Sequence, residues 1–279
     1  VLERRPDYSR IWRFVGWTAF LSGDYDTAIA AYDRAVELFP ADTDWAAERT
    51  LALTQAGRAD VDALVDRALA VPALRPIVVS TNSPRLAERL AHLPVRVELD
   101  PPGEPFHFGR RLGELIARHG MQRCFYIGGG AGPLLPASDM ASIAEAVLGT
   151  DHLLVTNNFY SSDFAAFGPT SALLEQPPPK NDNELAWLLG EDAGLPIREL
   201  PRSGATQLDV DTPADLLTLA VHPGAGPHAR AYLDGLHLDT SALDAALPLM
   251  LDRDATILVA GGVSSATWGY LERETACST

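Results

Sequence analysis

The stretch 123–140, RCFYIGGGAGPLLPASDM, joins a short apolar run to three successive glycines. The run 124–127 predicts a buried strand, and the glycines put bare backbone at the point where that strand ends. In open α/β sheets, ligands bind beyond the carboxyl ends of the strands. We therefore regard Gly128, Gly129 and Gly130 as candidate ligand-binding residues. The alternative is a tight turn that uses glycine only for its conformational freedom.

The composition of the chain limits the class of protein to which it can belong. It has 279 residues, a formal net charge of −15 and 47% hydrophobic residues, so a packed core in one large or two modest domains is expected. No basic run is longer than Arg110-Arg111, so we expect neither a nucleic acid nor an anionic membrane surface as a partner. Cys124 and Cys277 form no disulfide framework, and no signal peptide or membrane span is recognisable, so we expect a cytoplasmic protein.

The first 72 residues contain no convincing strand and predict helices. Small and aromatic residues recur there at the spacing of two closely packed helices, with a turn at Gly23 and a stop at Pro40. The pattern over about residues 9–42 resembles the tetratricopeptide repeat. The positions that carry the resemblance are Trp12, Gly16, Gly23, Tyr25, Ala28, Tyr32, Ala35 and Pro40. It implies an α-helical hairpin, which a protein partner could contact.

From Arg75 the pattern changes to strands that alternate with helices. The predicted strands cover 76–82, 95–99, 124–127, 151–158 and 196–200. The predicted helices between them cover 83–92, 106–119 and 139–148, the last capped by Ser138. This alternation predicts right-handed βαβ units and a mostly parallel sheet. We expect a helical segment over 1–72 and an α/β domain over 73–279.

Three further stretches complete the predicted domain. The irregular part 168–194 contains Lys180, the only lysine, which is either functional or a solvated loop residue. Residues 206–211 are predicted to run from a strand into a helix capped by Thr212. Residues 255–260 predict an outer strand, followed by two glycines and a helix from Ser264.

Asp209-Val-Asp211 is the strongest candidate for metal chemistry. In a strand, residues i and i+2 point to the same face, so the two carboxylates would converge. Hard oxygen ligands at a strand end suit Mg²⁺ or Mn²⁺ bound to a substrate phosphate. The alternative is that Asp211 caps the following helix while Asp209 is solvated.

Polar side chains follow other predicted strands. Asn82 follows the first of them, and Asn157, Asn158 and Asp163 follow the fourth. These residues are candidates to bind a base or a sugar, and they are equally natural as polar residues that cap loops.

The segment 208–219, LDVDTPADLLTL, resembles a D-x-D-T-P-x-D-L segment of one enzyme family. That family comprises the nucleotidyltransferases related to 2-phospho-lactate guanylyltransferase and molybdenum-cofactor guanylyltransferase. VVSTN at 78–82, a short strand ending in Asp100, and FYIGGGAGPLLPASDM at 125–140 match further segments of the family in the same order. The resemblance covers about residues 59–221.

The resemblance implies a fold, a reaction and a metal. The fold is a three-layer α/β domain like that of nucleotide-diphospho-sugar transferases. The reaction transfers a nucleotidyl group from a nucleoside triphosphate to a phosphate with Mg²⁺. By this match, Asp209 and Asp211 stand where a metal-binding residue is expected.

Two features depart from the family pattern. The aspartate of the family's G-D-x-P segment falls on Ala131, which cannot hold a metal ion. The family's opening strand, with its L-A-G-G-x-x-x-R triphosphate loop, has no equivalent, and the helical hairpin occupies its place. Both losses reduce charge neutralisation and positioning, on which nucleotidyl transfer depends.

Two hypotheses follow from these observations. The first is an enzyme that binds a nucleoside triphosphate or nucleotide-sugar with Mg²⁺ or Mn²⁺. The second is a catalytically degenerate binding or scaffold protein that uses the helical hairpin for protein contacts. For the first, the candidate catalytic residues are Asp209, Asp211 and Lys180, and the candidate metal ligands are Asp209 and Asp211. The candidate nucleotide-binding residues are Asn82, Gly128, Gly129, Gly130, Asn157 and Asn158.

Overall fold

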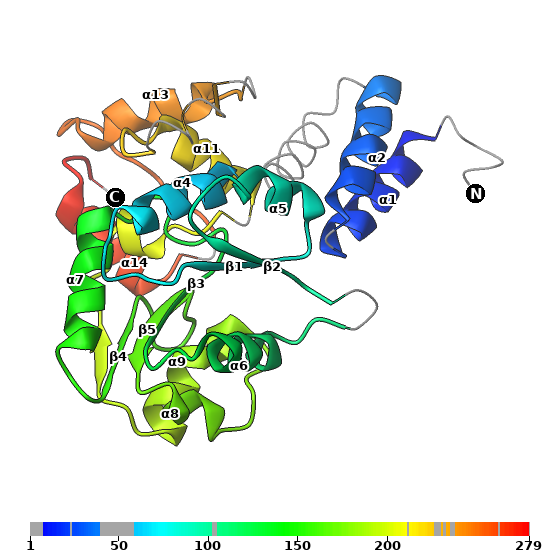
Figure 1. Ribbon diagram of the computed structural model, residues 1–279. Helices are drawn as coiled ribbons and strands as arrows, with labels where there is room; N and C mark the ends of the chain where they lie inside the picture. Colours follow the sequence, from blue (N-terminus) through cyan, green and yellow to red (C-terminus); the bar gives the residue numbers. More distant parts are fainter. Residues whose placement is uncertain are drawn as a thin grey trace.

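Figure 1 shows the fold of the chain, a computed structural model. The structure describes residues 8–22, 24–39, 59–101, 105–210, 212–225, 230, 233–234, 238–261 and 263–278. Helices surround two small sheets, and a pair of helices stands to one side of them (Figure 1). No helix of these ranges is long and apolar enough to cross a lipid bilayer.

The N-terminal pair of helices, α1 (Ser9–Leu21) and α2 (Tyr25–Leu38), forms an antiparallel hairpin. The two helices approach closely at Gly16, because a Cβ atom there would lie 3.0 Å from the ring of Tyr32. Tyr32 is fully buried, and the side chain of Asp24 caps α2. The expected helical hairpin is therefore present. That it is a tetratricopeptide repeat stays a prediction.

The strands of the described chain form two separate sheets. They are β1 (Val78–Thr81), β2 (Arg96–Leu99), β3 (Cys124–Ile127), β4 (Leu153–Thr156), β5 (Phe164–Gly168) and β6 (Ile197–Glu199). β1 and β2 pair in parallel, and the other four strands form a sheet of order β3-β5-β4-β6. β5 runs antiparallel to both β3 and β4, and β4 runs parallel to β6.

The mixed α/β class expected from the sequence is confirmed, but the mostly parallel sheet is not. Two of the three pairings in the four-stranded sheet are antiparallel, because β5 lies between β3 and β4 in the opposite direction. β5 follows β4 after only a short loop, without the crossover helix that a parallel neighbour needs. This strand was not predicted from the sequence.

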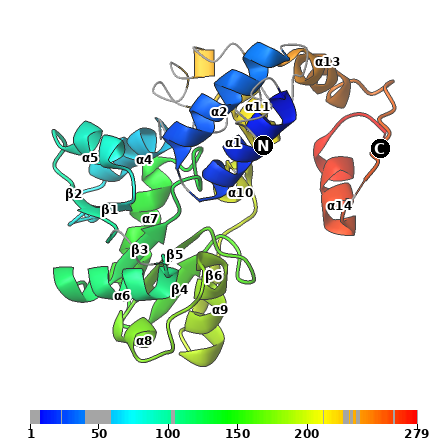
Figure 2. The same cartoon turned by 90° about the vertical axis from the view of Figure 1, so that its right-hand side faces the viewer.

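Alternating side chains of the four-stranded sheet enter two different cores. On one face, Leu154 and Phe167 join a core with α6 (Phe108–His119), and on the other face Val155 and Phe164 join a core with α7 (Ala137–Leu148). Figures 1 and 2 show these helices on opposite sides of the strands. The four-stranded sheet is therefore covered by helices on both faces.

The helix α4 (Ala59–Leu69) belongs to the core on the α7 face. Its Leu64 packs in the same cluster as Met140 of α7, and the guanidinium of Arg67 donates to the carbonyl oxygen of Pro133 at 2.5 Å. The remaining helical elements are α5 (Pro84–Leu90), α8 (Ser171–Leu174), η1 (Asp182–Glu184), α9 (Leu185–Trp187), η2 (Leu188–Asp192), α10 (Gly204–Gln207), α11 (Pro213–Val221), α13 (Ser241–Met250) and α14 (Ser265–Glu274).

Helix caps explain several of these boundaries. Ser83 caps α5, Ser264 caps α14, and Thr212 and Asp215 form a capping box at the start of α11, as the sequence predicts. The predicted cap at Ser138 is wrong, because α7 begins two residues earlier than predicted, at Ala137, after Pro136.

Two predicted strands are absent from the described structure. Residues 204–207 form helix α10 instead, and only Asp209 makes an isolated β-bridge, with Ala131. Residues 257–260 lie outside any strand, and Thr256 makes a single bridge with Ser278.

Candidate functional site

The glycine loop after β3 lies directly against Asp209. Asp209 forms an antiparallel bridge with Ala131, and the backbone N–H of Val210 donates to the carbonyl oxygen of Gly130 at 3.1 Å. The N–H of Gly132 donates to Leu208 at 3.3 Å. Two motifs about 80 residues apart are thus joined by backbone hydrogen bonds at the carboxyl end of β3.

Gly130 is required by this contact. A Cβ atom on residue 130 would lie 2.6 Å from the carboxylate oxygen Oδ1 of Asp209, well inside the closest approach of real side chains. Glycine at position 130 therefore does more than permit a turn. Because it has no side chain, the carboxylate of Asp209 can pack directly against the loop backbone. This is the part of the predicted site that the fold brings together most closely.

Asn157 and Asp163, which lie between β4 and β5, support the same glycine loop. The amide of Asn157 donates to Asp163 Oδ2 at 2.6 Å and to the carbonyl oxygen of Thr206 at 3.0 Å, and its oxygen accepts from the N–H of Asp163 at 3.1 Å. The N–H of Gly128 donates to the carbonyl oxygen of Asp163 at 3.0 Å. Asn157 is 1% exposed, and its side-chain amide is already hydrogen-bonded within the protein. Asn157 therefore positions the loop and has little hydrogen-bonding capacity left for a ligand.

Tyr126 and Asp182 were not recognised as site residues from the sequence. The hydroxyl of Tyr126 donates to Asp182 Oδ2 at 2.9 Å. Burial raises the pKa of Tyr126, and the negative charges of Asp182, Asp209 and Asp163 raise it further. The carboxylate of Asp182 therefore contacts the phenol, and those of Asp209 and Asp163 lie near enough to raise its pKa. No local pattern could reveal this group, because tertiary packing alone brings it together.

Lys180 lies in the loop that carries Asp182. Its backbone N–H donates to Glu184 Oε2 at 2.9 Å, and the preceding Pro179 accepts a hydrogen bond from Gly109 at the start of α6. The Lys180 side chain is exposed and lines the same cavity as Asp182 and Gly129. The lone lysine thus lines the same cavity as Asp182, and no contact with another described residue fixes its ammonium group in place.

The remaining predicted site residues lie apart or outside the described residues. Asn82 is exposed after β1, in the other sheet. Asn158 accepts from the N–H of Tyr160 at 3.2 Å, as a loop cap does. Asp211 lies outside the described residues.

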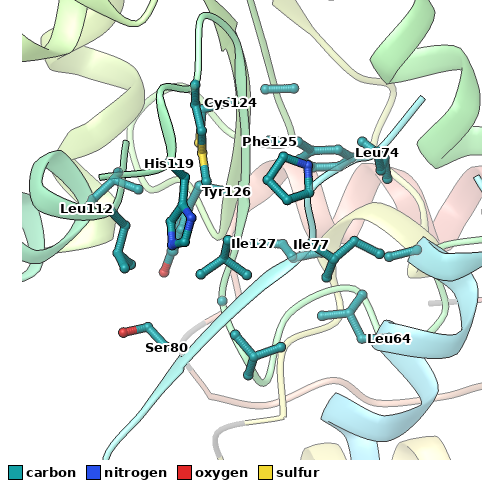
Figure 3. A pocket seen from close by; sticks show the side chains of 18 of the residues that line it. Leu64, Leu74, Ile77, Ser80, Leu112, His119, Cys124, Phe125, Tyr126 and Ile127 are labelled. Atoms are coloured by element: carbon teal, nitrogen blue, oxygen red, sulfur yellow. The ribbon is translucent and has the colours of Figure 1, made fainter. Parts of the chain in front are cut away.

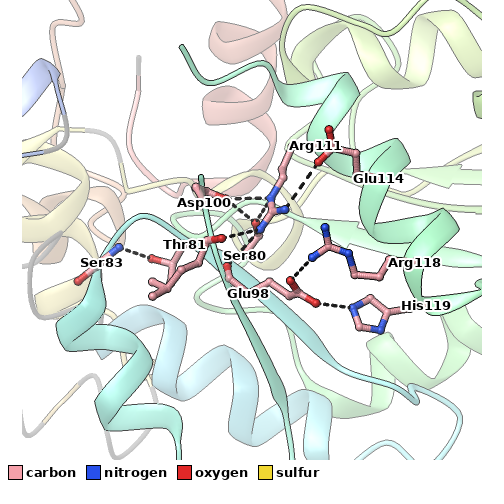
Figure 4. Close-up of polar contacts among 10 residues, drawn as sticks. Ser80, Thr81, Ser83, Glu98, Asp100, Arg111, Glu114, Arg118 and His119 are labelled. Atoms are coloured by element: carbon pink, nitrogen blue, oxygen red, sulfur yellow. Dashed lines mark hydrogen bonds and ion pairs between the residues drawn. The ribbon is translucent and has the colours of Figure 1, made fainter. Parts of the chain in front are cut away.

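A second polar cluster lies at the carboxyl ends of β1 and β2 (Figure 4). Arg111 of α6, only 7% exposed, donates through Nε to Asp100 Oδ1 at 3.0 Å and to Ser80 Oγ at 2.9 Å. Ser80 also donates to Asp100 at 2.8 Å. These contacts satisfy a buried guanidinium, so this cluster attaches β1 and β2 to α6.

An apolar cavity of about 820 Å³ separates the two sheets (Figure 3). Ile77 and Ser80 border it on the β1 side, and Cys124 and Ile127 on the β3 side. Its polar end reaches Gly128, Gly129, Lys180 and Asp182, beside the carboxylates described above. A volume of this size is in the range of sites that hold small molecules, roughly 300–1,000 Å³.

No metal centre is preformed among the described side chains. No group of three or more His, Cys, Asp or Glu residues in the described ranges is arranged to hold a metal ion. Mg²⁺ commonly binds through one or two carboxylates together with substrate phosphates. Asp209 fits that mode of binding, whereas a cage made only of protein ligands does not fit the described residues.

Comparisons with known proteins add a distant structural similarity. No protein-family model matches the chain, and no curated protein matches it. A solved structure similar to it is that of CMP:2-keto-3-deoxy-manno-octonic acid synthetase complexed with CTP, at 16% sequence identity and a TM-score of 0.42. The match covers 57% of this chain and 85% of that chain. Similarity at this level assigns neither a fold nor an activity to the chain.

Proposed function

We propose that the chain binds a nucleoside triphosphate or nucleotide-sugar together with Mg²⁺ or Mn²⁺ at the carboxyl end of β3. The observation that carries the proposal is the contact between Gly130 and the carboxylate of Asp209. It puts a glycine backbone loop and a hard oxygen ligand at one edge of a cavity. If the site is active, it transfers a nucleotidyl group to a phosphorylated acceptor.

The charges around the loop explain why a cation is part of the proposal. Asp163, Asp182 and Asp209 act together on the phenol of Tyr126, so the region is strongly negative. A triphosphate would be repelled there unless positive charge intervened. A divalent cation held by Asp209 would supply that neutralisation, and the exposed Lys180 could contact the phosphates from the other side.

The experiment is thermal melting with each nucleoside triphosphate in turn, with and without Mn²⁺. A ligand at about 100 times its dissociation constant stabilises the native protein by ~2.7 kcal/mol, which is several degrees. We expect a metal-dependent shift with one nucleotide. Cooperative melting without a shift for any nucleotide would contradict the proposal.

Asp209→Asn is the variant that tests the site, because it keeps the shape of the side chain and removes the charge. We expect it to abolish the metal-dependent part of the shift. Asp151→Asn is the matched control, because Asp151 is exposed before the amino end of β4, far along the strand from the loop. An equal loss in both variants would mean that Asp209 has no special role.

A second candidate is a binding protein that does not catalyse transfer. Ala131 favours it, because this residue is 3% exposed, faces Asp209 in the bridge and supplies no carboxylate. Pyrophosphate release in the presence of nucleotide and Mn²⁺ separates the two candidates. Ala131→Asp should raise Mn²⁺ affinity if this position belongs to the metal site, and unchanged affinity would exclude that.

A further inference from the structure

The cavity between the two sheets has the position of a missing strand. All four residues of β1 (Val78–Thr81) and all four residues of β3 (Cys124–Ile127) line it. A strand that faced the cavity with one side would contribute only alternate residues. Successive residues therefore mean that the backbone edges of β1 and β3 border the cavity.

Each of these edges lacks a partner strand in the described structure. β1 pairs only with β2, and β3 pairs only with β5, so each is an edge strand of its sheet. Edge strands present rows of N–H and C=O groups that can pair with another chain. Here the two edges border one apolar space instead of open solvent.

Helices cover the cavity in the way they would cover a continuous sheet. Leu64 of α4 and Met140 of α7 line it on one side, and Phe108 and Leu112 of α6 line it on the other (Figure 3 labels Leu64 and Leu112). Protein interiors are normally close-packed, so an apolar space of about 820 Å³ in the middle layer calls for an occupant.

The chain also contains a strand-like segment that has no sheet. Residues 255–260, Ala-Thr-Ile-Leu-Val-Ala, are uncharged and rich in β-branched side chains, and they lie outside any strand. Leu258 is 91% exposed and Val259 39%. The preceding helix α13 has no buried residue. We call residues 255–260 the donor segment.

The donor segment of the same copy is not near the cavity. Figure 2 shows α13 and α14, which flank it, on the side of the molecule away from β1 and β2. The N–H of Ile257 donates to the carbonyl oxygen of Ser278 at 2.9 Å, and α13 contacts α11. Within the part of the chain that the structure describes, the pairing of Ala255 and Ile257 with Ser278 would have to be released for the donor segment to join another molecule.

We propose that the donor segment of a second copy of this chain inserts between β1 and β3. The insertion pairs both edges, fills the apolar space and buries Leu258. Because each copy has one donor segment and one cavity, the exchange is reciprocal and gives a closed, two-fold symmetric dimer. The inserted strand would lie beside the proposed nucleotide site, in the same cavity, but strand insertion and nucleotide binding have separate tests.

The first test is the mass of the chain in solution. Sedimentation over about a hundredfold range of concentration should give a dimer that dissociates on dilution. Ile257→Pro should give a monomer, because proline removes an N–H and is not accommodated in a central strand. A monomer at every concentration, or a dimer that Ile257→Pro does not affect, would overturn the proposal.

Leu258→Lys provides a second variant in case the proline disturbs folding. It should also shift the equilibrium to the monomer, because it places a charge in the apolar cavity. Leu21→Lys is the matched control, since Leu21 is 68% exposed on α1 and belongs neither to the cavity lining nor to the donor segment. Loss of the dimer in the control as well would indicate a different interface. Circular dichroism verifies that all three variants are folded.

A peptide experiment tests the cavity directly. A fluorescent peptide of residues 252–261, DRDATILVAG, should bind the Ile257→Pro monomer, whose cavity is intact and empty of a donor. The same peptide with proline at position 257 should bind ~10-fold more weakly, because it loses about one backbone hydrogen bond. Equal binding of the two peptides, or no binding, would contradict strand insertion and leave the cavity as a small-molecule pocket.

Discussion

The two sheets of this protein are held together in different ways. In the four-stranded sheet, the side chains of β4 and β5 are buried on both faces, and Phe164, Phe167 and Leu154 are at most 1% exposed. In the two-stranded sheet, β1 and β2 are partly exposed along their length, and the polar cluster of Arg111, Asp100 and Ser80 holds their ends.

The two sheets therefore differ in what stabilises them and in how readily each could accept another strand. Apolar burial on two faces dominates the free energy of the four-stranded sheet. The two-stranded sheet has only a small apolar cluster, in which Val79 and Val97 pack against Leu86 of α5, and it depends more on directional contacts. It is therefore the part of the α/β region that can gain most from a new strand, and the predictions below test this contrast.

Removing an aromatic ring from the four-stranded sheet should have the largest effect. Phe167→Ala should lower the free energy of unfolding by about 3–5 kcal/mol, because a fully buried ring leaves a cavity. Val79→Ala in β1 should cost only about 1–2 kcal/mol, since Val79 is partly exposed and loses two methyl groups. Urea unfolding measures both values. Similar values for the two variants would mean that the sheets do not differ in this way.

Breaking the polar cluster should affect the two-stranded sheet next most strongly. Asp100→Asn removes the anionic acceptor of the buried Arg111 and should cost about 2 kcal/mol. Ser80→Ala removes only a neutral partner and should cost less, about 1 kcal/mol. Hydrogen exchange should show the loss mainly at β1 and β2. Uniform loss of protection across β4 and β5 would contradict a local role.

The loss of stability at acid pH should depend on Glu98 in β2. Burial acts to raise the pKa of Glu98, but the charge of Arg118 and hydrogen bonds from His119 and Arg118 outweigh it and lower the pKa below its usual value. A lowered pKa in the folded state contributes stability above the unfolded pKa, about 4.3, which is lost as the pH falls through the folded value. Glu98→Gln should therefore make the free energy of unfolding fall less steeply as the pH is lowered. An unchanged dependence of this free energy on acid pH would contradict the assignment.

The smallest expected effect concerns the thiol of Cys124. Burial raises its pKa to about 12, so the thiol stays protonated at pH 8 and should react with iodoacetamide only as fast as the protein opens. Stability should also fall as the pH rises above about 8.5, because the folded state then holds a proton that the unfolded state releases. Cys124→Ala removes both behaviours, and mass spectrometry of alkylated peptides follows the reaction. Fast alkylation of native Cys124 would show that the cavity is open to solvent.

Sequence patterns predicted strands and caps better than pairings. β3 was placed at its observed bounds, 124–127, because the glycines mark its end, and the capping box of Thr212 and Asp215 follows from residue type alone. β5 was missed because Phe164–Gly168 is short, contains no β-branched residue and runs in the opposite direction to its neighbours in the sheet. The donor segment was predicted as a strand from composition, but a strand forms only where an edge accepts it.

For the site, the sequence indicated the right loop but an incomplete set of partners. Gly130 and Asp209 were both named, and the structure places them in contact. Asp182 and Tyr126 could not be found, because their contact spans 56 positions and depends on the packing of the loop against α6. Asn82 was named for its position after a strand, and that strand belongs to the other sheet.

The close approach at Gly130 has a consequence for how such chains can vary. Any side chain at position 130 would occupy the space of the Asp209 carboxylate, which lies 2.6 Å from the position of a Cβ atom. The two positions are therefore expected to change together during evolution. A related chain with alanine or serine at 130 should carry a smaller residue at 209, or a loop shifted away from the bridge, and in either case it should have lost the close contact on which the proposed metal site rests.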